Sequence, residues 1–309
     1  MKAKLAVTIP TRSRPDKLIL CLEALEQAQA YIKFPVYVCD SSPDSLVRKE
    51  VAEVCAQFSF ATLHTHEGKN ISASKNFCAK IANEPLLVNV DDDVNVEPQA
   101  ILELYQRYLQ TSGWAVVCGS VFWGVTWDGP FVIRRIGYGR PPRQGENPSF
   151  LLGAFFLYPK ALADFLPWNE RVAVSEDVFM GALWRSYRVT LVCEGKARAI
   201  HNRVAPLYGV NYVGGHIYTN LFDALIANRN LPRAMMYEIF GFAAGVKVYS
   251  TSMSALKTFI IEWYRGHRYL VRDWKYLTEL VGKPVPSVRT NTALNAEAVN
   301  LRVATRKVD

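Results

Sequence analysis

The chain has 309 residues, half of them apolar, so it can bury a substantial core and its composition does not favour disorder. The formal net charge of +8 is uneven: residues 1–230 carry 24 Lys and Arg against 22 Asp and Glu, whereas residues 231–309 carry 12 against 6. The basic tail indicates an acidic partner, which could be a membrane surface, a phosphorylated carrier or a nucleic acid.

The six cysteines are scattered and form neither a C-x-x-C pair nor a compact cluster with histidine, which argues against a zinc site or a disulfide scaffold. The basic start Met1–Lys4 is followed by too few apolar residues for a signal peptide before Pro10 interrupts them. The stretch 204–222 contains no Asp, Glu, Lys or Arg, but it is too polar to span a bilayer. We therefore expect a cytoplasmic protein, either free or held peripherally on the cytoplasmic face of a membrane.

Short apolar runs alternate with helical patterns over the first hundred residues, which is typical of βαβ units and a mostly parallel sheet. Strands are predicted at Leu5–Ile9, Val36–Cys39, Ala61–His64 and Leu86–Val90. Helices are predicted at about Asp16–Tyr31 and Ser45–Gln57, and from Ser72, as the capping residue, to about Ile81.

The second part of the chain begins with an aromatic, β-rich region from Trp114 to Leu157. Helices are then predicted at Pro159–Phe165 and Ser175–Trp184, with a short strand at Val189–Val192 between the second helix and the tail. Beyond about Asn228 the pattern is helical almost to Tyr276, and from about Lys283 it shows no clear periodicity. The fold class predicted is therefore α/β with a helical extension at the C-terminus.

Polar residues follow three of the predicted strands. Thr11 and Arg12 follow the first, Asp40 the second, and the triplet 91–93 the fourth. Open α/β sheets bind ligands outside the carboxyl ends of their strands. The sequence therefore predicts one cleft that contains all three groups.

The triplet Asp91-Asp92-Asp93 is the strongest chemical signal in the sequence. Adjacent carboxylates disfavour each other's ionisation unless a cation neutralises them. Mg²⁺ or Mn²⁺ would do so, because these ions bind one or two carboxylates together with phosphate oxygens and water. An EF-hand is excluded, since Val96 and Leu102 stand where its loop needs Gly and Glu. A solvated acidic turn remains the alternative to a metal site.

These features resemble the family-2 glycosyltransferases of the GT-A fold. Val7–Arg12 is similar to that family's first strand and nucleotide loop, and Asp40 stands where the family has its base-contacting Asp. Asn70–Asn76 resembles the N-x-G-x-x-x-A-R-N stretch, with Lys75 where Arg is commoner. The triplet matches the DxD position, and Ser175-Glu176-Asp177 resembles the later E-D element. The likeness covers roughly residues 5–203.

The resemblance implies a GT-A catalytic domain over residues 1–230, with a nucleotide-binding half of about 1–110 and an acceptor half of about 111–230. A basic helical extension, 231–309, follows it. The implied reaction is an inverting, metal-dependent transfer of a sugar from a nucleotide-sugar, with UDP or dTDP favoured, to a hydroxyl of a glycan or lipid-linked acceptor. Asp177 would be the general base, and Mn²⁺ or Mg²⁺ the cofactor.

The resemblance also assigns candidate roles around that reaction. Asp93 is the first candidate metal ligand, with Asp91 facing the ribose or the metal and Asp92 the least defined of the three. His201 is a further metal or diphosphate ligand, unless it is structural. The nucleotide-binding candidates are Pro10, Thr11, Arg12, Asp40, Lys75, Asp91 and Asp92. The donor and acceptor candidates are Gly153, Ala154, Glu176 and Arg203. Gly153 could instead be a strand bulge, and Lys75 a solvated lysine.

Two regions keep more than one interpretation. Six aromatic residues could line an acceptor subsite or belong to the core: Trp114, Phe122, Trp123, Trp127, Phe131 and Tyr138. The tail combines aromatic and cationic residues, which suits a membrane interface, but it could equally pack on the catalytic domain or form a homodimer.

Other functions fit the sequence less well. A sugar nucleotidyltransferase should open with a glycine-rich phosphate loop, and residues 10–15 contain no glycine. A phosphatase of the HAD type would need its paired Asp after the first strand. A nucleic-acid partner is not expected, because the catalytic half is almost neutral and lacks a recognised binding motif. A catalytically inactive glycan-binding relative of the same fold remains an alternative.

Overall fold

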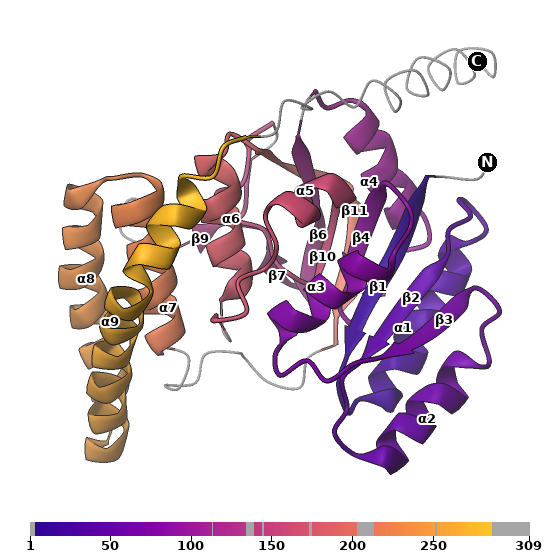
Figure 1. The fold of residues 1–309 in the computed structure, drawn as a ribbon, viewed down its shortest axis with the longest axis horizontal. Helices are drawn as coiled ribbons and strands as arrows, with labels where there is room; N and C mark the ends of the chain where they lie inside the picture. Colours follow the sequence, from indigo (N-terminus) through magenta and orange to yellow (C-terminus); the bar gives the residue numbers. More distant parts are fainter. Residues whose placement is uncertain are drawn as a thin grey trace.

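The computed structural model describes residues 4–112, 114–133, 139–143, 145–172, 175–202, 213–250 and 252–285. A nine-stranded sheet runs through the molecule in the order β3-β2-β1-β4-β10-β6-β11-β5, with β7 paired to β6 (Figure 1). The strands are β1 (Leu5–Thr11), β2 (Val36–Asp40), β3 (Ala61–Thr65), β4 (Leu86–Val90), β5 (Val94–Val96), β6 (Ala115–Trp123), β7 (Thr126–Gly129), β10 (Phe155–Pro159) and β11 (Thr190–His201). Two further short strands, β8 (Val132–Ile133) and β9 (Gly139–Arg140), pair with each other.

The predicted parallel sheet is confirmed. Strands β1 to β4 pair in parallel, as do β6 and β11. Strand β10 lies antiparallel between β4 and β6 and joins the two parallel groups. Strands β5 and β7 are also antiparallel to their partners.

Helices cover both faces of the sheet. Helices α1 (Pro15–Ala28), α2 (Ser45–Cys55) and α4 (Ala100–Leu109) share one hydrophobic core, and α3 (Ile71–Ile81), α5 (Lys160–Phe165) and α6 (Glu176–Ser186) contribute to the other. The alternation of side chains along each strand supplies both cores: in β1, Leu5 and Val7 belong to the first and Ala6 to the second.

The C-terminal helices stand at one side of the molecule, at the opposite end from β3 and α2 (Figure 1). They are α7 (Val213–Leu221), the π-helical η2 (Phe222–Ala227), α8 (Leu231–Tyr249) and α9 (Met253–Val281). Leu270, Leu277 and Leu280 of α9 belong to the same core as α6. The described part of the tail 231–309 therefore packs on the preceding part of the chain, chiefly through contacts of α9 with α7.

Several elements differ from the sequence predictions. Asn70, rather than Ser72, caps α3: its side chain accepts a hydrogen bond from the backbone N–H of Ala73. Strand β11 is much longer than the predicted strand Val189–Val192. Polar residues between Glu194 and Arg198 interrupt the apolar pattern in the sequence, and the strand continues past them with a shift in its register against β6.

Helix α7 has no counterpart among the sequence predictions. Its glycines are poor helix formers. A Cβ at Gly214 would lie only 2.8 Å from Glu262 Oε2, and one at Gly266 only 2.6 Å from the backbone oxygen of Gly214. Here glycine lets α7 and α9 approach closely, so a helix forms for reasons of tertiary packing.

Candidate functional site

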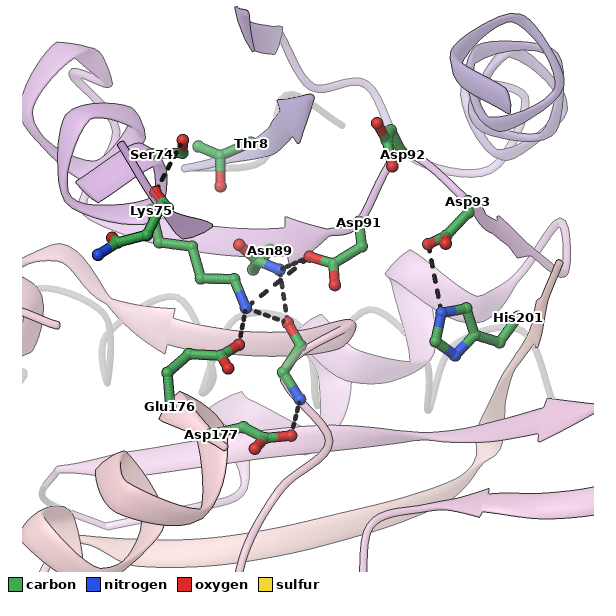
Figure 2. A network of polar contacts seen from close by, with 12 residues as sticks. Thr8, Ser74, Lys75, Asn89, Asp91, Asp92, Asp93, Glu176, Asp177 and His201 are labelled. Carbon is green, nitrogen blue, oxygen red and sulfur yellow. Dashed lines mark hydrogen bonds and ion pairs between the residues drawn. The ribbon is translucent and has the colours of Figure 1, made fainter. Parts of the chain in front are cut away.

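Loops and element ends from distant parts of the sequence meet at one edge of the sheet. The triplet leaves the end of β4, Glu176 and Asp177 open α6, and His201 ends β11 (Figure 2). Gly153 precedes β10. The structure thus brings the triplet, the candidate base and the candidate histidine to one edge of the sheet. The single cleft that the sequence predicted for Thr11, Arg12, Asp40 and the triplet stays a prediction.

Asp91 is the member of the triplet whose side chain is most open, at 21 % exposed. Its Oδ1 accepts a hydrogen bond from Asn89 Nδ2 at 3.1 Å and lies 3.9 Å from Lys75 Nζ. Its backbone N–H donates to the oxygen of Ala154 at 2.9 Å, which ties the triplet to the start of β10. Burial raises the pKa of Asp91, while Lys75 opposes that rise.

Asp92 is fully buried. Its Oδ2 accepts a hydrogen bond from Thr11 Oγ1 at 2.6 Å, and its Oδ1 lies 2.7 Å from Arg14 NH2. Burial raises its pKa to about 7, against the opposing effect of Arg14. These contacts occupy both Asp92 and the Thr11 hydroxyl within the protein, which differs from the nucleotide contacts expected for them. Arg12 is exposed, and its NH1 donates to the oxygen of Lys69 at 3.2 Å.

Asp93 lies between a guanidinium and an imidazole. Its Oδ2 is 2.8 Å from Arg14 NH1, and its Oδ1 is 3.3 Å from His201 Nε2. Burial would raise the pKa of Asp93, but His201 and Arg14 outweigh burial and hold it below its usual range.

His201 is held from its other side by Asp128 of β7. The distance from Nδ1 to Asp128 Oδ2 is 2.6 Å, and both side chains are buried. Burial alone would lower the pKa of His201, but its hydrogen bonds to Asp128 and Asp93 raise it to about 9. Asp128 therefore fixes the ring so that Nε2 faces the triplet.

The donor set fits a divalent cation, given further ligands. Asp93 and His201 offer a carboxylate and an imidazole side by side, and Asp128 supplies the outer carboxylate that metal-binding histidines usually have. Across the residues that the structure describes, no three His, Cys, Asp or Glu side chains converge on one ion position. A cation held there would take its remaining ligands from phosphate oxygens and water.

Asp177 is fixed by the backbone. Its Oδ2 accepts a hydrogen bond from the N–H of Gly153 at 3.0 Å, and its Oδ1 accepts one from the N–H of Val178 at 2.7 Å. Burial, followed by the charge of Glu176, raises the pKa of Asp177 to about 7. Ser175, just before the helix, has a left-handed backbone (φ 60°), and its Oγ lies 2.8 Å from His216 Nδ1.

Lys75 is enclosed by protein, not exposed to a nucleotide. Its Nζ donates to the oxygen of Gly153 at 2.9 Å and to Glu176 Oε1 at 3.1 Å, and it lies 4.6 Å from the centre of the Trp168 ring. Only 1 % of the residue is exposed. The geometry therefore gives Lys75 a positioning role that connects Asp91, Gly153 and Glu176 (Figure 2).

Gly153 is required at its position by close packing. A Cβ there would lie 2.8 Å from Lys75 Nζ and 3.1 Å from both Glu176 Oε1 and Asp177 Cβ. Its peptide group connects two parts of the site, because its oxygen accepts from Lys75 while its N–H donates to Asp177.

Asp40 lies at the end of β2 and is fully buried. Its Oδ1 accepts hydrogen bonds from the backbone N–H and the hydroxyl of Ser42. Its Oδ2 has no hydrogen-bond partner among the described residues. Such a buried acceptor is costly unless a ligand completes it. Pro10 lies in β1 beside Cys39, and Arg203 lies outside the described residues.

Three contributors to this site were not found from the sequence: Arg14, Asn89 and Asp128. Arg14 lies 79 residues from Asp93, and Asp128 lies 73 residues from His201. Arg14 follows β1 in the same polar turn as Thr11 and Arg12, which is the one signal in the sequence that could have identified it. The sequence around Asp128 contains no local pattern that indicates a site.

The family is decided by the sequence match over residues 6–165, more than half of the chain, to Glycosyl transferase family 2. The chain belongs to this family. It is a glycosyltransferase, as the resemblance implied, and GT-A glycosyltransferases share its fold. No curated protein sequence gives a significant match.

Solved structures of other glycosyltransferases have a similar fold at low identity. Residues 1–349 of S. aureus TarS, in complex with UDP-GlcNAc, align with a TM-score of 0.55 at 14% identity over 90% of this chain and 91% of that chain. The mannosyltransferase PcManGT from Pyrobaculum calidifontis, in complex with GDP-Man and Mn²⁺, aligns with a TM-score of 0.51 at 12% identity over 91% of this chain and 85% of that chain. At such identities the likeness establishes the fold alone.

Proposed function

We propose that this glycosyltransferase moves a sugar from a nucleoside diphosphate sugar to a hydroxyl of a glycan or lipid-linked acceptor, with inversion at the anomeric carbon. The fixed, buried carboxylate of Asp177, at the same sheet edge as the triplet, is the observation that carries the proposal. An inverting transfer needs one carboxylate that accepts the proton of the attacking hydroxyl.

Asp177 is suited to that role by its position and its pKa. Two backbone N–H groups hold both of its oxygens, so the carboxylate stays aligned without a further side chain. A pKa of about 7 lets it take up a proton during the reaction and release it afterwards at neutral pH. Glu176 is occupied by Lys75, which leaves Asp177 as the base of the pair.

Asp93 and His201 would hold Mn²⁺ or Mg²⁺ beside the donor diphosphate. When bound, the cation would stabilise the negative charge on the departing nucleoside diphosphate. Asp128 keeps His201 oriented toward Asp93, and Asn89 and Lys75 keep Asp91 in place toward the donor ribose. PcManGT, whose structure contains GDP-Man and Mn²⁺, supports a metal in this fold.

Asp40 would recognise the nucleobase. Its unpartnered Oδ2 can accept the N3–H of uracil or thymine, and the UDP-GlcNAc complex of TarS is in keeping with a uridine donor. We therefore favour UDP-sugars or dTDP-sugars. Pro10, Arg12, Ala154 and Arg203 remain proposed contacts to the nucleotide or the donor sugar.

The C-terminal helices would hold the enzyme against an anionic membrane surface. Helix α8 exposes Met235, Ile239 and Phe240, each more than half exposed. Basic residues outnumber acidic ones two to one in the tail, which complements an anionic surface. No helix in the described part of the chain is both long enough and apolar enough to cross a bilayer. The contact would therefore be peripheral.

A thermal-shift screen of nucleotide-sugars tests the proposed reaction. UDP with Mn²⁺ should raise the melting temperature, and Asp93→Ala should abolish the effect of the metal. Asp177→Asn should keep nucleotide binding and lose transfer. Undiminished transfer by Asp177→Asn would refute the role of the base, and equal UDP binding with and without Mn²⁺ would refute the role of the metal.

A further inference from the structure

A cleft lies where β6, β7 and β11 meet α4, residues 142–143 and residues 145–147. It encloses about 830 Å³ and is lined by Arg107, Ser120, Phe122, Trp127, Arg143, Lys196 and Arg198, among others. Two of the aromatic residues considered for an acceptor subsite, Phe122 and Trp127, lie in its wall, whereas the triplet and Asp177 do not. Its volume falls within the range of small-ligand sites.

At β7, the cleft and the Asp128–His201 pair of the candidate active site lie on opposite faces of the strand. Phe122 pairs with Trp127 across β6 and β7 and with Ile200 across β6 and β11. Since neighbouring residues of a strand point to opposite faces, Trp127 faces the cleft while Asp128 faces His201. A ligand in the cleft would therefore not compete with the donor.

The charge of the cleft is positive. Four lining residues are cationic and two, Glu146 and Glu194, are acidic. Arg140 already binds both oxygens of Glu146, at 2.5 and 2.6 Å. Arg143 and Lys196 are exposed, and neither forms an ion pair with another residue in the described ranges. They remain available for an anionic group of a ligand.

The cleft also has a rigid aromatic wall. Trp127 donates its indole N–H to the oxygen of Pro130 at 2.9 Å. Its ring lies edge-on to the ring of Phe122, with 5.3 Å between the ring centroids. The guanidinium of Arg198 lies 4.9 Å from the centre of the Phe122 ring. Flat, apolar ring faces of this kind pack well against the C–H faces of sugar rings.

We propose that this cleft binds an oligosaccharide that carries carboxylate or phosphate groups. The aromatic wall would contact the sugar rings, while Arg143 and Lys196 bind the anionic groups. A nucleic-acid strand fits less well, because it requires a groove of continuous positive charge along its backbone, whereas Glu146 and Glu194 interrupt this one.

Calorimetric titration of the full chain, without any nucleotide-sugar, tests the proposal separately from sugar transfer. The probes are hexagalacturonate, phosphorylated mannohexaose, neutral maltohexaose, inorganic phosphate and a thymidine hexanucleotide. We expect the two acidic hexasaccharides to bind more tightly than every other probe. Failure of both to bind, or equal binding of the neutral sugar, of free phosphate or of the hexanucleotide, would overturn the proposal.

Matched double variants locate the binding. Arg143→Ala with Lys196→Ala should weaken binding of the acidic hexasaccharides by about tenfold, because two charge-assisted contacts are lost. Lys33→Ala with Lys80→Ala, which removes two exposed cations from the β2 and α3 side, should leave the affinity unchanged. Equal losses in the two double variants would show non-specific attraction and refute this location.

Discussion

The orientation of His201 by Asp128 leads to a sharp prediction for Asp128→Asn. The substitution keeps the size of the side chain but removes the charge that faces His201 Nδ1 at 2.6 Å. An amide can rotate to present either its oxygen or its nitrogen, so the imidazole is no longer fixed with Nε2 toward Asp93. Loss of an outer carboxylate of this kind typically weakens metal binding by about 10- to 100-fold, equivalent to about 1.4–2.7 kcal/mol. We therefore expect Asp128→Asn to bind Mn²⁺ more weakly by this factor.

The assay is a titration of the full chain with Mn²⁺ in the presence of UDP, in which free Mn²⁺ is measured by electron paramagnetic resonance. The control is Asp164→Asn, an exposed carboxylate of α5 whose only ion pair among the described residues is with Lys160. Unchanged Mn²⁺ affinity in Asp128→Asn at an unchanged melting temperature would refute the reasoning. If the variant also loses stability, Asp128→Glu, which restores the carboxylate, should recover Mn²⁺ binding in part.

Three further predictions follow from the site and the tail. The value of kcat/KM should rise as the pH rises through about 7, because Asp177 accepts a proton only when ionised. Glu176→Gln should move the midpoint of this pH profile to a lower pH, since it removes a charge that raises the pKa of Asp177. Gly153→Ala should overpack the site, which costs about 1–3 kcal/mol of stability, and should therefore lower both the melting temperature and kcat. The control Gly195→Ala, whose Cβ would meet no atom within 4 Å, should change neither quantity. Replacing Ile239 and Phe240 by Ser should weaken co-sedimentation with anionic liposomes. The control Leu46→Ser on α2 should leave co-sedimentation unchanged. If the double substitution changes the sedimentation velocity but not liposome binding, the exposed face of α8 forms a homodimer instead.

The structure also affects how the tail should be tested. A chain that ended near Asn230 would lose Leu270, Leu277 and Leu280, which are buried together with α6. Such a truncation would expose core surface and promote aggregation irrespective of membrane binding. Substitutions on the exposed face of α8 avoid this problem because they leave the packed face of α9 intact.

The sequence predicted the part of the fold that depends on local periodicity. Strands β1, β2 and β4 are largely apolar runs, and the position of the triplet after β4 follows directly from the end of such a run. The insertion of β10 between β4 and β6 could not be predicted in the same way, because antiparallel pairing over more than sixty residues leaves no local pattern. The same holds for Asp128, whose importance arises only when β7 pairs with β6.

For Lys75, the sequence motif predicted the basic residue and its position but not its burial. The resemblance placed a basic residue at this position of α3, and the structure does bring it close to Asp91. Its exposure, however, depends on Trp168 and Gly153, which close over it from distant parts of the chain. A buried ammonium needs several oxygen partners, and Gly153, Glu176 and Asp91 provide them, so the residue serves to hold the site together.

The three carboxylates of the triplet have different partners, and each lies beside a cationic side chain. Adjacent carboxylates favour a neutralising cation, and three cationic side chains lie beside them: Lys75 near Asp91, Arg14 between Asp92 and Asp93, and His201 against Asp93. The loop is therefore neutralised before any ligand binds, so a divalent cation is not needed for folding at this position. What a bound cation would change is Asp93 and His201 alone, because Asp92 is already occupied by Thr11 and Arg14, and Asp91 is anchored by Asn89. Under the proposed function, metal binding would fall to Asp93 and fold stability to Asp92, so substitutions at these two residues are not expected to be equivalent.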